Sequence, residues 1–293
     1  MYIVNLKGGL GNQLFQYFFS QSLKLSSENK TIKFSETIIN QNQQKLDDVF
    51  DIQLDWANQK DLSNVSFVLR NYFLRKNIPR VAKKLKIKNF FNNLLIENES
   101  LFYDFNTLKK FKYLDGYWQN QNYFFKFKEE IQSKLKFKNH LDIQNQFNID
   151  KNLSKIAIHI RRGDYLKKKN TNILWIPPKE YYINYINYFN LKFPKNIFIF
   201  FSDDMDWVKN NFKDININKI FIDNTLHKGL NDFQLMSQCD HFIISNSTFG
   251  WWAAYISKNK NKIIVCPNKW FKNNLRKNEA IIPKAWIRDN IYS

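Results

Sequence analysis

The second half of the chain alternates short apolar runs with segments long enough to form helices. The runs are KIAIHI, NIFIFFS, KIFI, HFIIS and KIIVCP. Nearly continuous apolar strands that alternate with helices are typical of a parallel sheet covered on both faces. One intervening segment, PPKEYYINYINYFNLKF, opens with prolines suited to a first helical turn and repeats aromatic residues at helical spacing. We therefore expect a doubly wound α/β domain in this half.

The N-terminus predicts the start of a second unit of the same kind. YIVNL is typical of a buried strand, KGGLGN of a turn and QLFQYFFSQSLKLSS of a helix. From about Gln59 to Lys138 the pattern is amphipathic and we expect mostly helix. The polar stretch from Asn139 to Lys155 is the expected linker. We place the domains at residues 1–150 and 151–293 and expect two Rossmann-like domains that face each other across a cleft.

The charge of the chain is strongly positive, with 45 Lys and Arg against 26 Asp and Glu and a net charge of +19. Such a balance points to an anionic partner. Lys, Asn, Ile and Phe are residues of A- and T-rich codons, however, so base composition is an equally good explanation. Only seven of the basic residues are arginines, which makes each arginine position informative.

The cysteines and the N-terminus favour a cytoplasmic protein. Cys239 and Cys266 lie in separate apolar stretches without metal-ligand spacing, which favours buried free thiols over a disulfide. We see no secretory signal at the start and no window that reaches the roughly 18 apolar residues of a membrane span.

Two adjacent arginines stand at the end of the first apolar run, in HIRRGDY. Ligands of a parallel sheet bind beyond the carboxyl ends of its strands. Strand alternation sends neighbouring side chains to opposite faces, so Arg161 shares a face with His159 and is expected to point at a ligand. Its planar fork grips phosphate or carboxylate in a way that an ammonium cannot. We expect Arg162 to pair with Asp164 and hold the loop; a surface ion-pair loop is the alternative.

Two other segments fall at predicted strand ends. In FFSDDMDW, Asp204 and Asp206 match a divalent-metal pattern, but we prefer a helix cap by Ser202 or Asp203, whose carboxylate could also accept hydrogen bonds from a ligand. In SNSTFG, Ser247 or Thr248 at a helix start would offer hydroxyl and backbone N–H groups to an anion, or simply cap the helix.

The glycine loop GGLGNQ, Gly8 to Gln13, permits close backbone approach to a ligand. It lacks the third glycine of the dinucleotide fingerprint, since Leu14 occupies that place. An ordinary tight turn is the alternative, and a dehydrogenase is disfavoured.

In order along the chain, GGLGNQLFQY, HIRRGDY, FSDD and ISNSTFGWWAAYI resemble the α-1,2-fucosyltransferases of glycosyltransferase family 11. The resemblance spans nearly the whole chain, with few landmarks between residues 40 and 150. It implies a GT-B fold that binds GDP-L-fucose mainly through the C-terminal domain, with the N-terminal domain on the acceptor side. It also implies transfer of fucose, with inversion, to the 2-hydroxyl of a galactose in a glycan acceptor, without a metal or other cofactor.

The resemblance assigns roles to individual residues. Arg161 would grip the β-phosphate, His159 would lie beside the nucleotide and Asp232 would bind guanine. Further candidate nucleotide-binding residues are Asp203, Asn246, Ser247, Thr248, Phe249, Gly9, Gly11 and Gln13.

The general base stays open at this point. Asp164 and Asn12 are the candidate catalytic residues: Asp164 is the carboxylate nearest the motif, and Asn12 with Gln13 could orient the acceptor hydroxyl.

The alternatives are another nucleotide-sugar transferase or a non-enzymatic polyanion binder. Scattered lysines, and aromatics that sit within apolar patterns, disfavour nucleic acid as a partner. A basic patch would also fit peripheral contact with the anionic inner face of a membrane.

Overall fold

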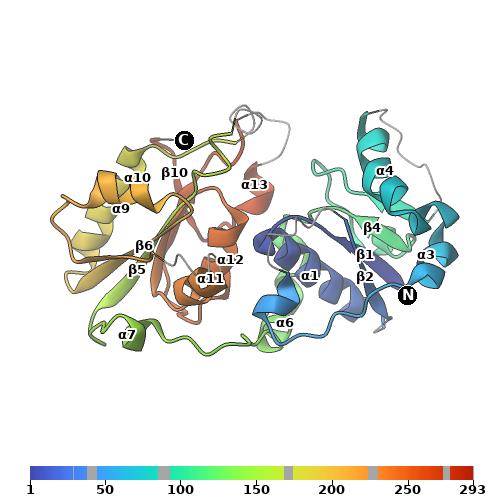
Figure 1. The fold of residues 1–293 in the computed structure, drawn as a ribbon, viewed down its shortest axis with the longest axis horizontal. Helices are drawn as coiled ribbons and strands as arrows, with labels where there is room; N and C mark the ends of the chain where they lie inside the picture. Colours follow the sequence, from blue (N-terminus) through green and yellow to red (C-terminus); the bar gives the residue numbers. More distant parts are fainter. Residues whose placement is uncertain are drawn as a thin grey trace. The chain divides into compact units, whose positions relative to one another are not determined.

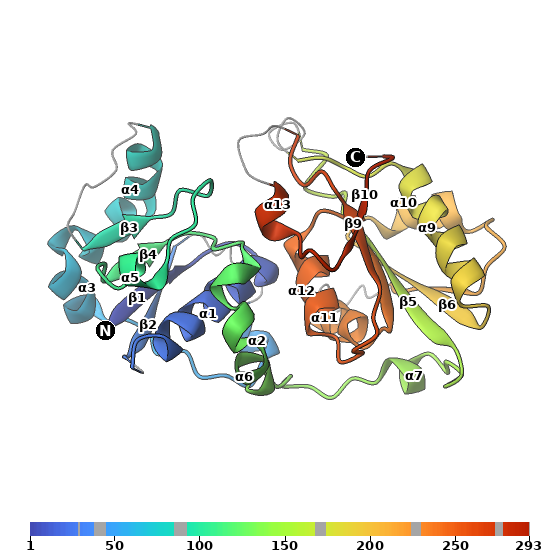
Figure 2. The same cartoon turned by 180° about the vertical axis from the view of Figure 1, so that it is seen from behind.

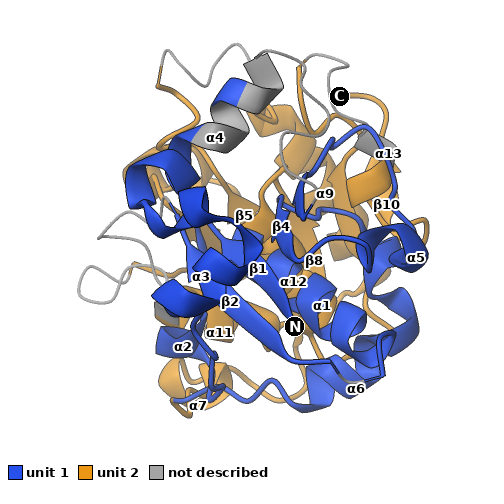
Figure 3. Cartoon of the chain, turned by 90° about the vertical axis from the view of Figure 1, so that its right-hand side faces the viewer, with its two compact units in different colours: residues 1–138 blue, residues 139–293 orange. Residues whose placement is uncertain are grey.

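The computed structural model describes residues 1–28, 30–37, 45–84, 93–167, 174–223, 230–272 and 278–292. The chain divides into two compact units, residues 1–138 and 139–293, coloured separately in Figure 3. This division comes twelve residues before the expected boundary at 150/151. Residues 139–150 were expected in the first domain and as part of a linker, but they belong to the second unit.

The expected linker is tied to the second unit by side-chain amides of one helix and of the residue that follows it. Gln234 donates to the carbonyl of Asn139 at 2.7 Å. Gln238 donates to the carbonyl of Leu141 at 2.6 Å and accepts from the backbone N–H of Ile143 at 3.0 Å. A polar sequence is therefore ordered here because its backbone groups find partners.

The first unit is built on a four-stranded parallel sheet in the order β2-β1-β4-β3. Its elements are β1 Tyr2–Leu6, α1 Leu10–Leu25, β2 Ile32–Glu36, α2 Leu46–Val49, α3 Gln59–Val65, the 3-10 helix η1 Phe67–Arg70, α4 Tyr72–Lys84, β3 Leu94–Ile96, α5 Phe105–Leu108, β4 Tyr113–Asp115, η2 Gln121–Tyr123, η3 Phe125–Phe127 and α6 Lys128–Ser133. The strand, turn and helix expected at the N-terminus are confirmed.

The expectation of mostly helix from Gln59 to Lys138 is wrong beyond α4. Two three-residue strands, β3 and β4, complete the sheet there. Each strand is too short to show a period, and much of the segment between and after them is irregular. The pairing of β4 with β1 next to it, a tertiary contact, makes these residues a strand.

The second unit contains a six-stranded sheet, all parallel, in the order β10-β9-β8-β5-β6-β7. Its elements are α7 Ile143–Gln146, β5 Ser154–Ile160, α9 Lys179–Lys192, β6 Asn196–Ser202, α10 Met205–Phe212, β7 Lys219–Phe221, α11 Leu230–Ser237, β8 His241–Ile244, α12 Thr248–Ile256, β9 Ile264–Pro267, α13 Asn278–Ile281 and β10 Ile287–Asp289. The five apolar runs are β5 to β9, so the doubly wound domain is confirmed.

Helices cover both faces of this second sheet. Figures 1 and 2 show α9 and α10 on one side and α11 and α12 on the other. Tyr181, Tyr182 and Phe189 of α9 pack with the isoleucines of β5 and with Phe212 of α10. Because β5 is hydrogen-bonded on both edges from Ile156 on and covered on both faces, residues 156–160 are buried, and the chain regains partial exposure at Arg161, past the carboxyl end of the strand.

The core of the first unit predicts a large response to one substitution. Phe19 in α1 is fully buried and stacks on Trp118, with ring centroids 4.0 Å apart and planes at 2°. Phe19→Ala should lower the free energy of unfolding by about 3 to 5 kcal/mol, since it removes an aromatic side chain and leaves a cavity. Chemical denaturation followed by far-UV circular dichroism measures this loss.

The matched control is Phe125→Ala in the same unit, where the ring is 67% exposed. That change should stay within about 0.5 kcal/mol of the parent. Equal effects of the two substitutions would contradict the packing described.

Candidate functional site

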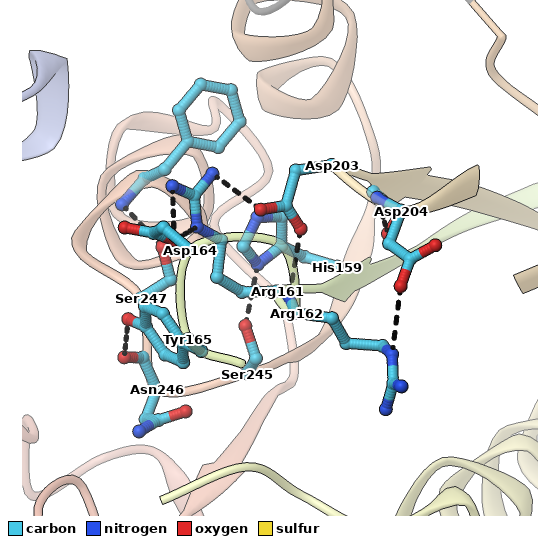
Figure 4. A network of polar contacts seen from close by, with 12 residues as sticks. His159, Arg161, Arg162, Asp164, Tyr165, Asp203, Asp204, Ser245, Asn246 and Ser247 are labelled. Atoms are coloured by element: carbon cyan, nitrogen blue, oxygen red, sulfur yellow. Dashed lines mark hydrogen bonds and ion pairs between the residues drawn. The ribbon is translucent and has the colours of Figure 1, made fainter. Parts of the chain in front are cut away.

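Three of the predicted segments meet at the carboxyl edge of the second sheet. In the register, Ile160 at the end of β5 lies opposite Ser202 at the end of β6, and His159 lies opposite Ile244 at the end of β8. HIRRGDY, SDD and SNSTFG continue from these three strand ends. Figure 4 shows their side chains in one polar network.

Arg161 is held by two carboxylates. Its Nε and Nη2 lie 3.0 and 2.8 Å from Asp164 Oδ1, and its Nη1 lies 3.3 Å from Asp203 Oδ2 (Figure 4). Burial alone would lower the pKa of Arg161, but the charges of Asp203 and Asp164 raise it above the usual value. The side chain is still 34% exposed, so a fixed, fully charged guanidinium lies at the surface of the strand edge.

The expected pairing of Arg162 with Asp164 is wrong. Arg162 Nε contacts Asp204 Oδ2 at 3.2 Å, and its guanidinium lies 3.8 Å from the ring centroid of Trp207. The two arginines do have different roles, as strand alternation predicts. The side chain of Asp164 lies on the same side of the loop as Arg161 and pairs with it. Arg162 therefore contacts Asp204 and Trp207, at the start of α10.

The expected cap of α10 is also corrected. Asp204, and not Ser202 or Asp203, accepts from the backbone N–H of Trp207 at 3.3 Å and is the N-cap. Ser202 supports the cap from behind, because its hydroxyl accepts from the N–H of Asp204 at 3.0 Å.

Asp203 bridges the arginine loop. Its Oδ1 accepts from the backbone N–H of Arg162 at 2.9 Å, while Oδ2 faces Arg161. A Cβ on Gly163 would lie 2.6 Å from Oδ2, so glycine is needed for the loop to approach this carboxylate. Asp203 therefore fixes both the backbone and the charge of the loop.

His159 lies beneath this network and is 4% exposed. Its Nδ1 is 3.0 Å from Ser245 Oγ, and its ring stacks on Phe249 with centroids 5.6 Å apart. A Cβ at Gly250 would come within 2.7 Å of Nδ1. Burial, and secondarily the charge of Arg161, lowers the pKa of His159 to about 3. The imidazole is therefore neutral and supports the start of α12.

The start of α12 is capped as predicted by Ser247, which accepts from the N–H of Phe249 at 3.3 Å. Tyr165 links this turn to Arg161: its hydroxyl donates to the carbonyl of Asn246 at 2.9 Å, and its ring lies 5.9 Å from the guanidinium. Sequence reasoning did not single out Tyr165, although it closes the HIRRGDY motif.

The other candidates of this unit lie around the same helix start. Asn246 is buried and donates to the carbonyl of Trp270 at 2.7 Å, while its Oδ1 has no hydrogen-bond partner among the described residues. Thr248 is half-buried at the first position of α12. Asp232, also half-buried, lies in the first turn of α11, whose Phe233 packs edge-on against Phe249 at 5.2 Å.

The glycine loop of the first unit joins β1 to α1. Gly9 is the N-cap of α1, and Gly11 and Gln13 are buried within that helix. Gln13 donates to the carbonyl of Gly8 at 2.9 Å and accepts from the N–H of Leu46 at 3.2 Å. Its amide therefore braces the loop. Asn12 Oδ1 accepts from Gln119 at 2.8 Å.

A polar cluster that sequence reasoning missed lies at the carboxyl ends of β1, β3 and β4. Lys7 forms an ion pair with Asp115 and lies 4.8 Å from the ring centroid of Tyr117. Glu97 accepts from the N–H groups of Tyr117 and Trp118 at 2.6 and 3.0 Å, and burial raises its pKa to about 7. This cluster could have been predicted only if LLI and YLD had been identified as the strands β3 and β4, since Glu97 directly follows β3 and Asp115 ends β4.

Cys239 and Cys266 are buried free thiols, as expected. Burial raises the pKa of Cys266 to about 12. In the described ranges, three or more His, Cys, Asp or Glu residues nowhere come together in a way that could hold a metal ion. None of the described helices combines the length and apolarity that crossing a membrane requires.

The buried imidazole predicts a pH dependence of stability. Because His159 has a pKa of about 3 when folded and 6.5 when exposed, the unfolded chain binds the extra proton between these values. The free energy of unfolding should fall by about 1 to 2 kcal/mol from this residue as the pH drops from 6.5 to 5. His159→Gln should remove that part of the fall, as measured by denaturation at both pH values.

His140→Gln is the control, since His140 is an exposed residue of the same unit. It should leave the pH dependence unaltered. A His159→Gln protein with the slope of the parent would show that the imidazole is not held neutral.

Comparison with known proteins places the fold first. The solved structure of Escherichia coli ADP-heptose LPS heptosyltransferase II is similar, with a TM-score of 0.51 and 9% sequence identity over 99% of this chain and 90% of that chain. With one parallel Rossmann-like sheet in each unit, the fold is GT-B.

Sequence comparison then gives the family. An α-1,2-colitosyltransferase of Escherichia coli is 28% identical over 98% of both chains. Galactoside 2-alpha-L-fucosyltransferase SEC1 of Bos taurus is 27% identical over 45% of this chain and 37% of its own. The profile of glycosyl transferase family 11 matches residues 1–290, and the chain therefore belongs to glycosyl transferase family 11.

Proposed function

We propose that the protein transfers L-fucose from GDP-β-L-fucose, with inversion, to the 2-hydroxyl of a galactose residue in a glycan. The observation that carries the donor part is Arg161, a partly exposed guanidinium fixed at the carboxyl end of a central strand. It lies next to Tyr165, which contacts the turn that starts α12. The linkage is supported by the names of two relatives, a 1,2-colitosyltransferase and a galactoside 2-fucosyltransferase.

The leaving group explains why arginine is needed. As the bond from the sugar to the diphosphate breaks, negative charge develops on the β-phosphate, and a preorganised donor of hydrogen bonds lowers the barrier. Since Asp164 and Asp203 occupy the fork of Arg161, we infer that phosphate oxygens replace at least one carboxylate when the donor binds. The carboxylates keep the side chain in place until then.

The remaining nucleotide contacts follow from the same edge of the sheet. We infer that the backbone N–H groups at Ser247 and Thr248 face the diphosphate and that Asp232 accepts from guanine. Phe249 and Asn246 shape the wall of this site. His159, neutral and buried, holds the start of α12 in position rather than exchanging protons.

The acceptor hydroxyl attacks the sugar opposite the leaving phosphate through an oxocarbenium-like transition state, for which positioning supplies much of the rate. We infer that the first unit holds the galactose, with Asn12 and the backbone of Gly9 and Gly11 at its glycine loop. Asp164 could act as a base only after leaving Arg161, so we assign it to orienting the guanidinium.

The runner-up differs in the donor sugar. One relative is named for colitose, which lacks the 3-hydroxyl of fucose, so a 3,6-dideoxy sugar is the second candidate. A non-enzymatic polyanion binder is disfavoured by the family match over residues 1–290.

One assay tests the donor, the acceptor and the metal requirement together. The protein should transfer sugar from GDP-fucose to galactose-terminated glycans, faster than from GDP-colitose, and mass spectrometry with linkage analysis should show a 1,2 bond. EDTA should not lower the rate, because arginine and helix N-termini neutralise the leaving group. Faster transfer of colitose would establish the runner-up, loss of activity in EDTA would revive a metal role for Asp204 and Asp206, and no transfer with either donor would refute the proposal.

Arg161→Lys tests the clamp. The substitution keeps the charge but loses the planar fork, so turnover should fall by about 10² to 10³. Arg162→Lys is the matched control, because Arg162 contacts Asp204 and Trp207 instead. It should lower turnover by less than tenfold. Near-normal turnover in Arg161→Lys would show that the clamp is assigned to the wrong residue.

A further inference from the structure

The first unit exposes an apolar and basic surface that the proposed reaction does not use. We define the α4 surface as the side chains of Phe67, Tyr72, Phe73, Leu74 and Val81, together with the cations Arg70 and Lys76. Phe67 and Phe73 are 76% and 69% exposed, and the other three apolar residues are between 42% and 51% exposed. Figures 1 and 2 show α4 standing beyond the strands of its own unit.

Leu74 and Val81 of α4 lie on the same side of the helix, because they are seven residues apart, which is two helical turns. Phe73 precedes Leu74 and points to the adjacent side, about 100° around the helix. Phe67 in η1 is a further exposed ring, just before the N-terminal end of α4. Exposed apolar side chains beside cations are typical of a helix that lies in the plane of a membrane interface.

Cations lie beside two of the exposed aromatic rings. The guanidinium of Arg70 lies 5.4 Å from the ring centroid of Phe67, and Lys76 Nζ lies 5.9 Å from that of Tyr72. Arg75 is anchored at the base of the helix, since its Nη1 donates to the carbonyl of Leu69 at 2.8 Å. An apolar face beside cationic groups can contact acyl chains and anionic headgroups at once.

The charge of the surrounding sequence separates this segment from the general lysine excess of the chain. Residues 62–96 contain eight Lys or Arg and no Asp or Glu. Three of the seven arginines of the chain, Arg70, Arg75 and Arg80, fall within it. Base composition explains lysine but neither these arginines nor a run of 35 residues without a carboxylate.

We propose that the α4 surface docks the protein on an anionic lipid bilayer, with Phe67, Phe73, Leu74 and Val81 in the interface and Arg70 and Lys76 at the headgroups. A single-stranded nucleic acid would also meet aromatics and cations. The aliphatic Leu74 and Val81, exposed on one side of α4, favour lipid because they offer no ring for a base to stack on.

Vesicle flotation with the full chain tests the proposal without a donor or an acceptor, so its result does not depend on the reaction proposed above. The protein should bind vesicles of phosphatidylethanolamine and phosphatidylglycerol, weakly bind phosphatidylcholine vesicles, and dissociate as salt is raised. Phe67→Ser with Phe73→Ser should weaken binding at least about tenfold. Lys76→Gln should weaken it about fivefold.

Matched controls come from η3 of the same unit, where Phe125 is 67% exposed and is followed by Lys126. Phe125→Ser and Lys126→Gln should bind as the parent does. Circular dichroism and the unfolding midpoint verify folding, and Leu74→Ser with Val81→Ser replaces the first pair if that pair is unstable.

Three results would overturn the assignment. The first is no binding of the parent to anionic vesicles at low salt, or equal binding of the parent and both apolar pairs. The second is tighter binding to a single-stranded oligonucleotide than to vesicles, lost in the same variants. The third is a dimer in light scattering that the apolar substitutions convert to a monomer, which would make the α4 surface a contact between two copies.

Discussion

The pairing of β5 with both β6 and β8 is the constraint on which the site depends. These hydrogen bonds bury β5 between two strands, and helices bury it on both faces, so residues 156–160 are inaccessible. The register brings the ends of the three strands to one edge. The polar side chains of the three loops that follow these strands therefore lie close together at that edge. The charged groups among them, such as Arg161 and Asp203, form ion pairs with one another.

Single residues of this network make several of its contacts. Asp203 bonds the backbone of Arg162 and the side chain of Arg161, so the same carboxylate fixes the loop and its charge. Beneath the loop, His159 can approach α12 only because residue 250 is glycine. A neutral imidazole is what such packing requires, since a charged ring would lie unsolvated next to the guanidinium. Asp203 thus holds the side chain of Arg161, while His159 packs against the start of α12 beneath it.

The fold was predictable where an apolar pattern runs over enough residues to show its periodicity. β1, α1 and β5 to β9 follow apolar runs that local pattern alone identifies. β3 and β4 are three residues each, and only pairing makes them strands. In the site, strand alternation separated Arg161 from Arg162 correctly, but it could not choose the partner of either. Asp164 is nearer to Arg162 in sequence and yet lies on the side of Arg161, while Asp204, 42 residues away, reaches Arg162 because β6 is adjacent to β5.

Arginine usage connects these observations. In a chain biased toward lysine, each arginine with a described side chain makes contacts that suit a guanidinium. Arg161 accommodates two carboxylates with its fork, and the guanidinium of Arg162 lies 3.8 Å from the ring centroid of Trp207. Arg75 and Arg288 reach backbone carbonyls of Leu69 and Ile282. Arg70 lies beside an exposed phenylalanine. Lysine would keep the charge at each place but lose the planar fork, a difference that matters most at Arg161, where two carboxylates are held at once.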